Sequence, residues 1–341
     1  MDKTGTSAIQ RFLFKNRQKL DKQEDLYYPA TGIWNDFSHH PFAFSIFEMS
    51  GYNKKNLEKL FRKLSIEIRN KKTILMSSEC LFKAPLKENF IFFKEFIERE
   101  FIKVKIVGYV RRQDEWVESR HKHSILVGHE LSLEQLQKPF FCNYKQFFDG
   151  WADIVGKSNV IVRPYERQQF VGGSILSDFL SIFGISDFSS YTMEAKTINH
   201  SLGVIETEFK RYCNLLDLSP KTFSKLNQLL LAHSENNKVN EKYFLSSHQR
   251  KAIIDKYAEI NHGLSVDYGQ GSALFLDLDT GKDGDCSKST SVNENMARIF
   301  DFIYKEDKRL FSILNEKINE ASQSEIEEIK ASAKILMARE N

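Results

Sequence analysis

Val104-Lys105-Ile106-Val107-Gly108-Tyr109-Val110-Arg111-Arg112 is the stretch that decides the fold of this 341-residue chain. Its apolar centre predicts a strand that is buried on both faces, as in a parallel sheet. Arg111 stands at the end of this strand, and open α/β sheets bind ligands beyond the carboxyl ends of their strands. Ser119 follows within a predicted helix that runs from about residue 114 to 126. We expect the guanidinium fork and the hydroxyl to grip one anion.

Apolar strands alternate with helical segments on both sides of this stretch. Residues 73–77 and 159–163 predict two further buried strands. Apolar residues at helical spacing predict helices at about 6–20, 54–70, 88–101, 143–155 and 174–183. The alternation predicts an α/β fold, a three-layer sandwich with a mostly parallel sheet. The pattern from about residue 198 to 268 is helical, so we expect a helical C-terminal half.

A polar, Gly- and Ser-rich segment at 279–291 predicts a linker. We therefore expect one α/β domain over residues 1–278, the linker at 279–291, and a charged helical extension over 292–341. The charged helices are best explained as a solvated face. The alternative is that they form a homodimer interface.

The second informative motif is Lys3-Thr4-Gly5-Thr6-Ser7, which leads directly into the first predicted helix. A glycine at this place lets the backbone approach an anion closely, and the N–H groups of the helix start point toward it. Lys3 adds a mobile positive charge, while Thr6 and Ser7 add hydroxyl donors. The motif is not a Walker A loop, because the lysine precedes the glycine.

Composition limits the other possibilities. The net charge is +3, which does not argue for nucleic-acid binding, so an anion site must be local. The four cysteines are far apart and suggest neither a disulfide framework nor a zinc site. No apolar run is long enough for a transmembrane segment, and no secretory signal precedes the body. We therefore expect a cytoplasmic protein that needs no metal.

The two motifs resemble the nucleotide-binding motifs of sulfotransferases that use 3′-phosphoadenosine 5′-phosphosulfate (PAPS), in particular those of bacteria. Lys-Thr-Gly-Thr-Ser matches the first motif, and Arg111 with Ser119 after a hydrophobic strand matches the second. Ser77-Ser78-Glu79 after a strand is a third point of similarity. The resemblance covers about residues 1–277 and implies the P-loop-like sulfotransferase fold.

The resemblance also implies the roles of the residues. Residues 3–7 would hold the 5′-phosphosulfate, and Arg111 and Ser119 would hold the 3′-phosphate. Lys3 would stabilise the charge that moves onto the leaving phosphate oxygen. The sulfuryl group would pass to a hydroxyl or amine of a glycan, lipid or small molecule, and we expect an acceptor that contains a saccharide.

The acceptor needs a general base, and the sequence offers three candidates. Glu79 follows a buried strand on the same rim as the two anion motifs. His39 and His40 lie in the irregular stretch after the first helix, and an ordinary histidine pKa suits this role. The sequence alone leaves the choice among these three open.

One departure from the family pattern concerns the first strand. A loop of this kind normally follows a central strand, yet only Met1 and Asp2 precede Lys3. We expect a natural reading frame that extends upstream by one apolar strand. Two alternatives to a sulfotransferase remain: a degenerate nucleotide-binding module without catalysis, and a nucleotide-dependent phosphotransferase.

Overall fold

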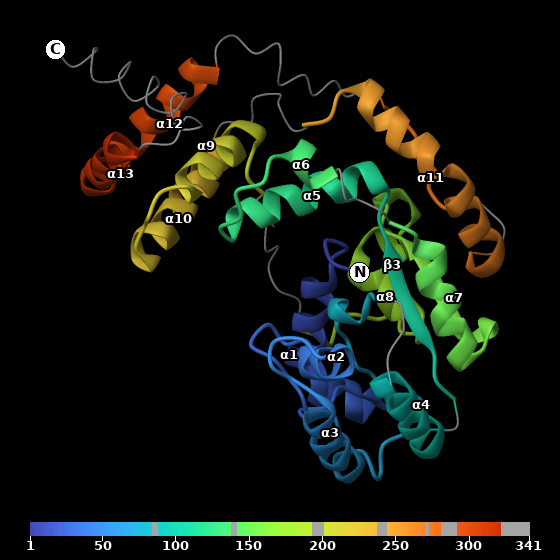
Figure 1. Cartoon of the computed structure of the whole chain (residues 1–341). Helices are drawn as coiled ribbons and strands as arrows, with labels where there is room; N and C mark the ends of the chain where they lie inside the picture. Colours follow the sequence, from blue (N-terminus) through green and yellow to red (C-terminus); the bar gives the residue numbers. More distant parts are fainter. Residues whose placement is uncertain are drawn as a thin grey trace. The chain divides into compact units, whose positions relative to one another are not determined.

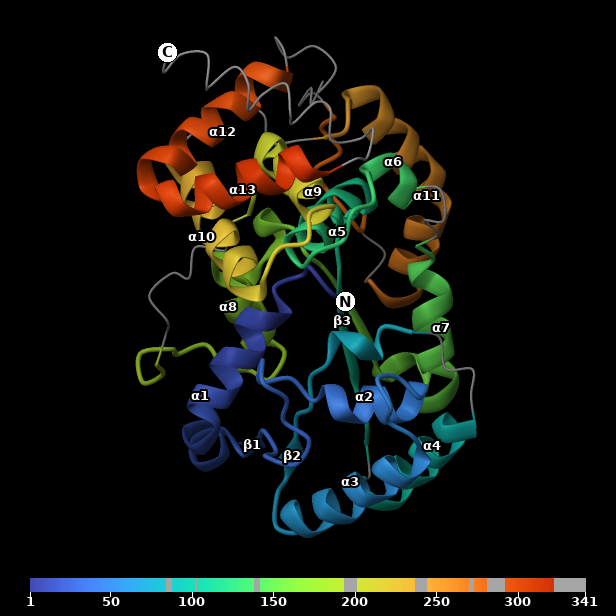
Figure 2. The same cartoon turned by 60° about the vertical axis from the view of Figure 1, so that its left-hand side comes forward.

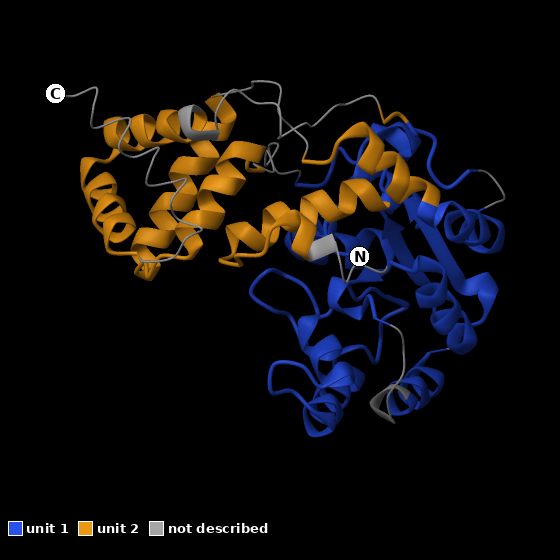
Figure 3. Ribbon diagram, turned by 45° about the horizontal axis from the view of Figure 1, so that its top comes forward, with its two compact units in different colours: residues 1–112, 142–197, 256–278 blue, residues 113–141, 198–255, 279–341 orange. Residues whose placement is uncertain are grey.

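The computed structural model describes residues 1–83, 88–101, 103–137, 142–192, 201–236, 244–269, 273–280 and 292–321. The chain forms two compact units, which Figure 3 draws in different colours. Unit 1 contains residues 1–112, 142–197 and 256–278, and unit 2 contains residues 113–141, 198–255 and 279–341. Each unit is therefore assembled from segments that are far apart in the sequence.

Unit 1 contains two pairs of parallel strands (Figures 1 and 2). β1 (Leu26–Tyr27) pairs with β2 (Thr73–Ile74), and β3 (Ile106–Val110) pairs with β4 (Val160–Pro164). The predicted strands around β3 and β4 are confirmed, whereas the strand predicted at 73–77 pairs only at its first two residues. Parallel pairing across helical connections bears out the α/β character. The described residues are mostly helical, however, and their strands form two separate two-stranded sheets rather than one continuous layer.

The helices of unit 1 begin where local signals place them. α3 (Lys54–Glu67) starts at Asn53, whose side chain and that of Asn56 form a capping box. Asn143 caps α7 (Tyr144–Val155), and Ser174 caps α8 (Ile175–Ser181). The other helices that belong wholly to unit 1 are α1 (Thr6–Glu24), α2 (His40–Phe47) and α4 (Glu88–Glu100).

One hydrophobic cluster connects both strand pairs of unit 1 to the first helix. It contains Leu13 of α1, Leu26 of β1, Leu75 just after β2, Tyr109 of β3 and Leu180 of α8. Each of these side chains is buried. Since α1 packs into this cluster, its N-terminal end has a fixed place beside the ends of the strands.

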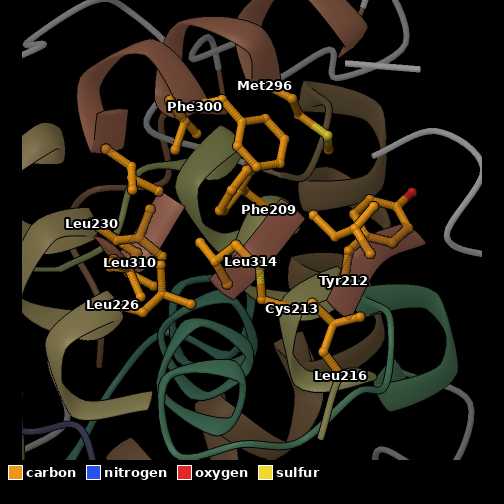
Figure 4. Packing of buried hydrophobic residues seen from close by; sticks show 14 residues of the cluster. Phe209, Tyr212, Cys213, Leu216, Leu226, Leu230, Met296, Phe300, Leu310 and Leu314 are labelled. Atoms are coloured by element: carbon orange, nitrogen blue, oxygen red, sulfur yellow. The ribbon is translucent and has the colours of Figure 1, made fainter. Parts of the chain in front are cut away.

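Unit 2 is a helical body with its own core. It contains α5 (Gln113–Leu126), α6 (Leu133–Gln137), α9 (Val204–Asn214), α10 (Pro220–Asn236), α12 (Val292–Glu306) and α13 (Lys308–Glu320). α11 (Ser247–Tyr268) crosses from unit 2 into unit 1. Figure 4 shows buried side chains of this core, including Phe209 and Leu230 together with Phe300 and Leu314.

This core changes the division expected from the sequence. The C-terminal helices α12 and α13 do not stand apart from the rest of the chain, because their apolar faces pack against α9 and α10. The predicted linker at 279–291 lies outside the described residues except for Asp279 and Thr280. No helix among the described residues is both long and apolar enough to cross a membrane.

Candidate functional site

The N-terminal segment of unit 1 forms a tight loop that opens into α1. Gly5 is the N-cap residue and has a φ of 76°, in the left-handed region that favours glycine. The Ala8 N–H donates to the Gly5 carbonyl oxygen at 3.1 Å. Thr6 and Ser7 precede this donor, so their N–H groups are among those that a helix start leaves without an intrahelical acceptor. Together with the positive end of the helix dipole, these groups can bind an anion.

Two members of this loop hold its shape. Thr4 is fully buried, and its hydroxyl donates to the Met1 carbonyl oxygen at 2.6 Å. A Cβ on Gly5 would lie 3.0 Å from Tyr165 and 3.1 Å from Ile175. The loop therefore packs so closely on its neighbours that a side chain at position 5 would push against them.

Arg111 lies beside this loop. Its Nη1 atom is 3.4 Å from the Lys3 carbonyl oxygen, across 108 residues of sequence. The guanidinium carbon is 5.6 Å from the centre of the Tyr165 ring. The Tyr144 hydroxyl donates to the Arg111 carbonyl oxygen at 2.7 Å, which fixes the backbone at the end of β3. The structure thus brings Arg111 of the second motif beside the first motif.

The side chains of Lys3 and Arg111 are two cations close together at this loop, with the carboxylates of Asp2 and Glu79 nearby. Burial lowers the pKa of Lys3 below its ordinary value, and the nearby charge of Arg111 lowers it further, against the opposing effect of the Asp2 and Glu79 carboxylates. Two cationic side chains thus stand at the N-terminus of a 19-residue helix. A bound anion would relieve their mutual repulsion.

Glu79 is tied to the same helix. The Gln10 side chain of α1 donates from Nε2 to Glu79 Oε2 at 2.9 Å, and the same nitrogen is 3.3 Å from Ser77 Oγ. The other carboxylate oxygen, Oε1, faces His40 Nε2 at 3.8 Å, which is too long for a hydrogen bond. Glu79 is therefore anchored by one oxygen, and the other oxygen can accept a proton.

His39 is engaged on both ring nitrogens. Its Nδ1 accepts from the Ser77 N–H at 3.2 Å, so its Nε2–H donates to the Pro29 carbonyl oxygen at 3.1 Å. The His39 N–H in turn donates to the Ser77 carbonyl oxygen at 2.7 Å. Burial lowers the pKa of His39 to about 4. This geometry assigns His39 to holding the loop against the end of β2 and disfavours it as a base.

His40 is the first residue of α2 and is also engaged on both sides. Its Nδ1 atom is 2.7 Å from Ser78 Oγ, and its Nε2 atom is 3.1 Å from Asp36 Oδ2. His40 is buried, whereas Glu79 is partly exposed. Among the three base candidates, Glu79 thus has the most accessible proton acceptor.

Ser119 lies on α5 in unit 2 and is partly buried. Arg111 belongs to unit 1, so their joint grip on one anion stays a prediction. Sequence reasoning missed two residues near Glu79: Gln10 and Asp36. Gln10 is a fully buried polar residue on the apolar face of α1, which was a usable signal. Asp36 lies four residues before His40, in an irregular stretch whose sequence gives no pattern that would pair the two.

The comparisons with known proteins give one relative and no family. A protein of Archaeoglobus fulgidus that is described as uncharacterized is 30% identical over 199 residues, which are 57% of this chain and 53% of that protein. The chain therefore spans about half the length of the relative it matches. No protein-family model matches the chain. No solved structure matches it either.

Proposed function

We propose that this protein is a PAPS-dependent sulfotransferase. The observation that carries the proposal is the meeting of Arg111 with Lys3 at the N-terminus of α1, while Gln10 of the same helix holds Glu79. An anion-binding loop, a cationic pair and a carboxylate base thus share one end of one helix.

The donor's 5′-phosphosulfate would lie on the loop formed by Lys3, Thr4, Gly5, Thr6 and Ser7. The N–H groups at the helix start would face its oxygens, and Lys3 would stabilise the charge that develops on the leaving phosphate. Arg111 would bind the 3′-phosphate with its guanidinium fork.

The acceptor would be a hydroxyl or amine, which we propose belongs to a saccharide-containing molecule. Its oxygen or nitrogen attacks the sulfur as the bond from sulfur to the bridging phosphate oxygen breaks. Glu79 Oε1 takes the acceptor proton, and adenosine 3′,5′-bisphosphate leaves with the electron pair of the broken bond. The hydrogen bond from Gln10 keeps Glu79 Oε2 out of the proton transfer and fixes the direction of Oε1.

We further propose that the two strand pairs of unit 1 belong to one parallel layer of a P-loop-like sulfotransferase fold. The shared cluster that contains Leu26, Leu75 and Tyr109 supports this arrangement, because residues of both pairs pack with α1.

The proposal is tested by binding of adenosine 3′,5′-bisphosphate, measured by calorimetry, and by its release from PAPS in the presence of saccharide acceptors. We expect Lys3→Ala and Arg111→Ala to weaken binding at least about tenfold, the equivalent of one lost charged hydrogen bond. Glu79→Gln should bind the bisphosphate normally and turn over at least about a hundredfold more slowly.

Lys105→Ala is the matched control, because Lys105 is an exposed cation that directly precedes β3, whereas Arg111 directly follows it. Equal affinity in wild type, Lys3→Ala and Arg111→Ala would refute the donor site. Tighter binding of ATP with magnesium than of the bisphosphate would favour a phosphotransferase, while binding of neither would favour a module without catalysis.

A further inference from the structure

Unit 1 contains a group of three potential metal ligands, which are Asp36, His40 and Glu79. The ligand atoms of the three side chains lie within 4.8 Å of one another. His40 Nε2 is 3.1 Å from Asp36 Oδ2 and 3.8 Å from Glu79 Oε1. Atoms bound tetrahedrally to zinc at about 2.1 Å lie roughly 3.4 Å apart. These two separations bracket this value and the third, between the Asp36 and Glu79 oxygens, is within 4.8 Å, so shifts of about 1 Å would bring the three atoms around one ion.

Each of the three side chains has a second polar atom, which is hydrogen-bonded to a neighbouring residue. Ser38 donates to Asp36 Oδ1 from its hydroxyl at 2.6 Å and from its N–H at 3.1 Å. Ser78 Oγ is 2.7 Å from His40 Nδ1, and Gln10 donates to Glu79 Oε2 at 2.9 Å. Metal ligands in proteins are oriented by outer hydrogen bonds of this kind, which leave the inner atom for the ion.

A separate observation concerns the buried amide of Gln10. The side chain is fully buried, and its Oε1 has no hydrogen-bond partner among the described residues. Buried acceptors are nearly always satisfied, so an orphan next to Glu79 calls for a donor. Water bound to an ion at Glu79 would be such a donor, since three protein ligands leave a fourth position open.

We propose that Asp36, His40 and Glu79 bind one Zn²⁺ ion. One imidazole nitrogen and two carboxylate oxygens suit zinc, whereas magnesium and calcium prefer oxygen ligands alone. Zinc at this place takes Glu79 Oε1, the atom that the proposed sulfuryl transfer uses as its base. Zinc therefore inhibits transfer rather than supporting it; this consequence, unlike the site itself, rests on the proposed function.

The site is tested on the full, tag-free chain after chelator dialysis, with Zn²⁺ titrated in competition with a chromophoric zinc indicator. We expect one bound ion in wild type and at least about tenfold weaker binding in Asp36→Asn, His40→Gln and Glu79→Gln. Asp25→Asn is the control, since Asp25 is an exposed carboxylate paired with Lys72. Zn²⁺ should raise the thermal midpoint of wild type and of Asp25→Asn, and not that of the three ligand variants.

Cys80 is the main alternative zinc ligand, because its thiol belongs to the residue directly after Glu79. Loss of zinc binding in Cys80→Ser, with retention in Asp36→Asn, would overturn the proposal in favour of a thiol site. Unchanged zinc affinity in folded Asp36→Asn and Glu79→Gln would overturn it, because neither carboxylate would then be a zinc ligand. Lys3→Ala should bind zinc normally even where it loses the nucleotide, so the donor site and the zinc site can fail independently.

Discussion

The Arg111 guanidinium lies 3.4 Å from the carbonyl oxygen of Lys3, so the end of β3 and the start of α1 share one place in unit 1. Both residues carry a positive charge, and the lowered pKa of Lys3 is partly due to Arg111. Local concentration of cations, rather than the net charge of the chain, is what recommends this loop as an anion site.

Gly5→Ala should lower the free energy of unfolding by more than alanine does at an open position where the glycine has a similar positive φ. Gly5 and Gly51 have almost the same φ, 76° and 78°, but only the added Cβ at Gly5 would meet other atoms within 4 Å. Gly51→Ala should therefore cost about 1 kcal/mol for the backbone alone. Gly5→Ala should cost a further ~1–3 kcal/mol because the methyl group presses on Tyr165 and Ile175.

Chemical denaturation of both variants measures this difference. The nucleotide affinity of folded Gly5→Ala should also fall, while Gly51→Ala should bind as wild type does. Equal destabilisation of the two variants would show that the loop can yield around position 5.

Glu67→Gln should destabilise unit 1 in a pH-dependent way. Glu67 accepts hydrogen bonds from the Tyr27 hydroxyl and from the N–H groups of Ala30 and Thr31, at 2.6 to 2.9 Å. Burial alone would raise the pKa of Glu67, but these hydrogen bonds outweigh burial and hold the pKa below 4.5. The carboxylate therefore stabilises the fold above this pH, by about 0.5–1 kcal/mol at neutrality once solvent screening of this partly exposed group is allowed for.

As the pH falls from 4.5 through the lower folded pKa, wild type should lose this advantage, and the two proteins should converge in stability. Unfolding free energies at pH 7 and in acid test the prediction. A gap between wild type and Glu67→Gln that stays constant in acid would contradict it. Tyr27→Phe removes one of the three donors and should have a smaller effect at pH 7.

Lys210→Met should stabilise unit 2 at neutral pH. Lys210 is buried on α9, where its Nζ lies 3.5 Å from the centre of the Phe223 ring and donates to Asn214. Burial lowers the pKa of Lys210 to about 8, against a smaller opposing effect of Cys213. The charged form is thus disfavoured in the fold. Removing the charged amine should raise the free energy of unfolding by about 1–2 kcal/mol, after the loss of its contacts with Phe223 and Asn214 is subtracted.

The sign of the pH dependence follows from the two pKa values of Lys210. Between about 8 and 10.5 the unfolded chain binds more protons than the folded one, so wild type gains stability as the pH rises. The advantage of Lys210→Met should therefore be constant below pH 8 and shrink above it. Lys221→Met, at an exposed position of α10, should change stability by less than about 0.5 kcal/mol at any of these pH values.

Local signals in the sequence were enough to place most helices and the longer strands. The apolar runs around β3 and β4 lie where the residues predict them, and the helices expected from about 54, 143 and 174 begin at the caps Asn53, Asn143 and Ser174. The strand at 73–77 stops early for a non-local reason. The Leu75 N–H still donates to the Tyr27 carbonyl oxygen, but two residues later His39 takes both backbone groups of Ser77, so the strand does not continue to residue 77.

The packing of the C-terminal helices α12 and α13 could not be predicted from the sequence, for a different reason. Met296, Phe300, Leu310 and Leu314 stand at helical spacing, and all four are buried in the core of unit 2. The many charges between them suggested a solvated extension. Since charged residues cover only the outer face of such helices, their number did not reveal that the inner face has a partner.

The sequence yields the base candidates and puts Glu79 first, but it does not decide among them. Glu79, His39 and His40 all have suitable chemistry, and only their hydrogen-bond partners distinguish them. Those partners come from Gln10, Pro29 and Ser77, which no rule of spacing connects to the histidines. Asp36 was missed for the same reason, because its role depends on where the irregular stretch folds back.

The role of His39 matters for anyone who wishes to engineer this protein. His39 completes the backbone pairing that Ser77 would otherwise seek from another strand, so variants at position 39 should be recovered for solubility and yield rather than for altered substrate preference. A library that aims at altered function should therefore leave this imidazole unchanged.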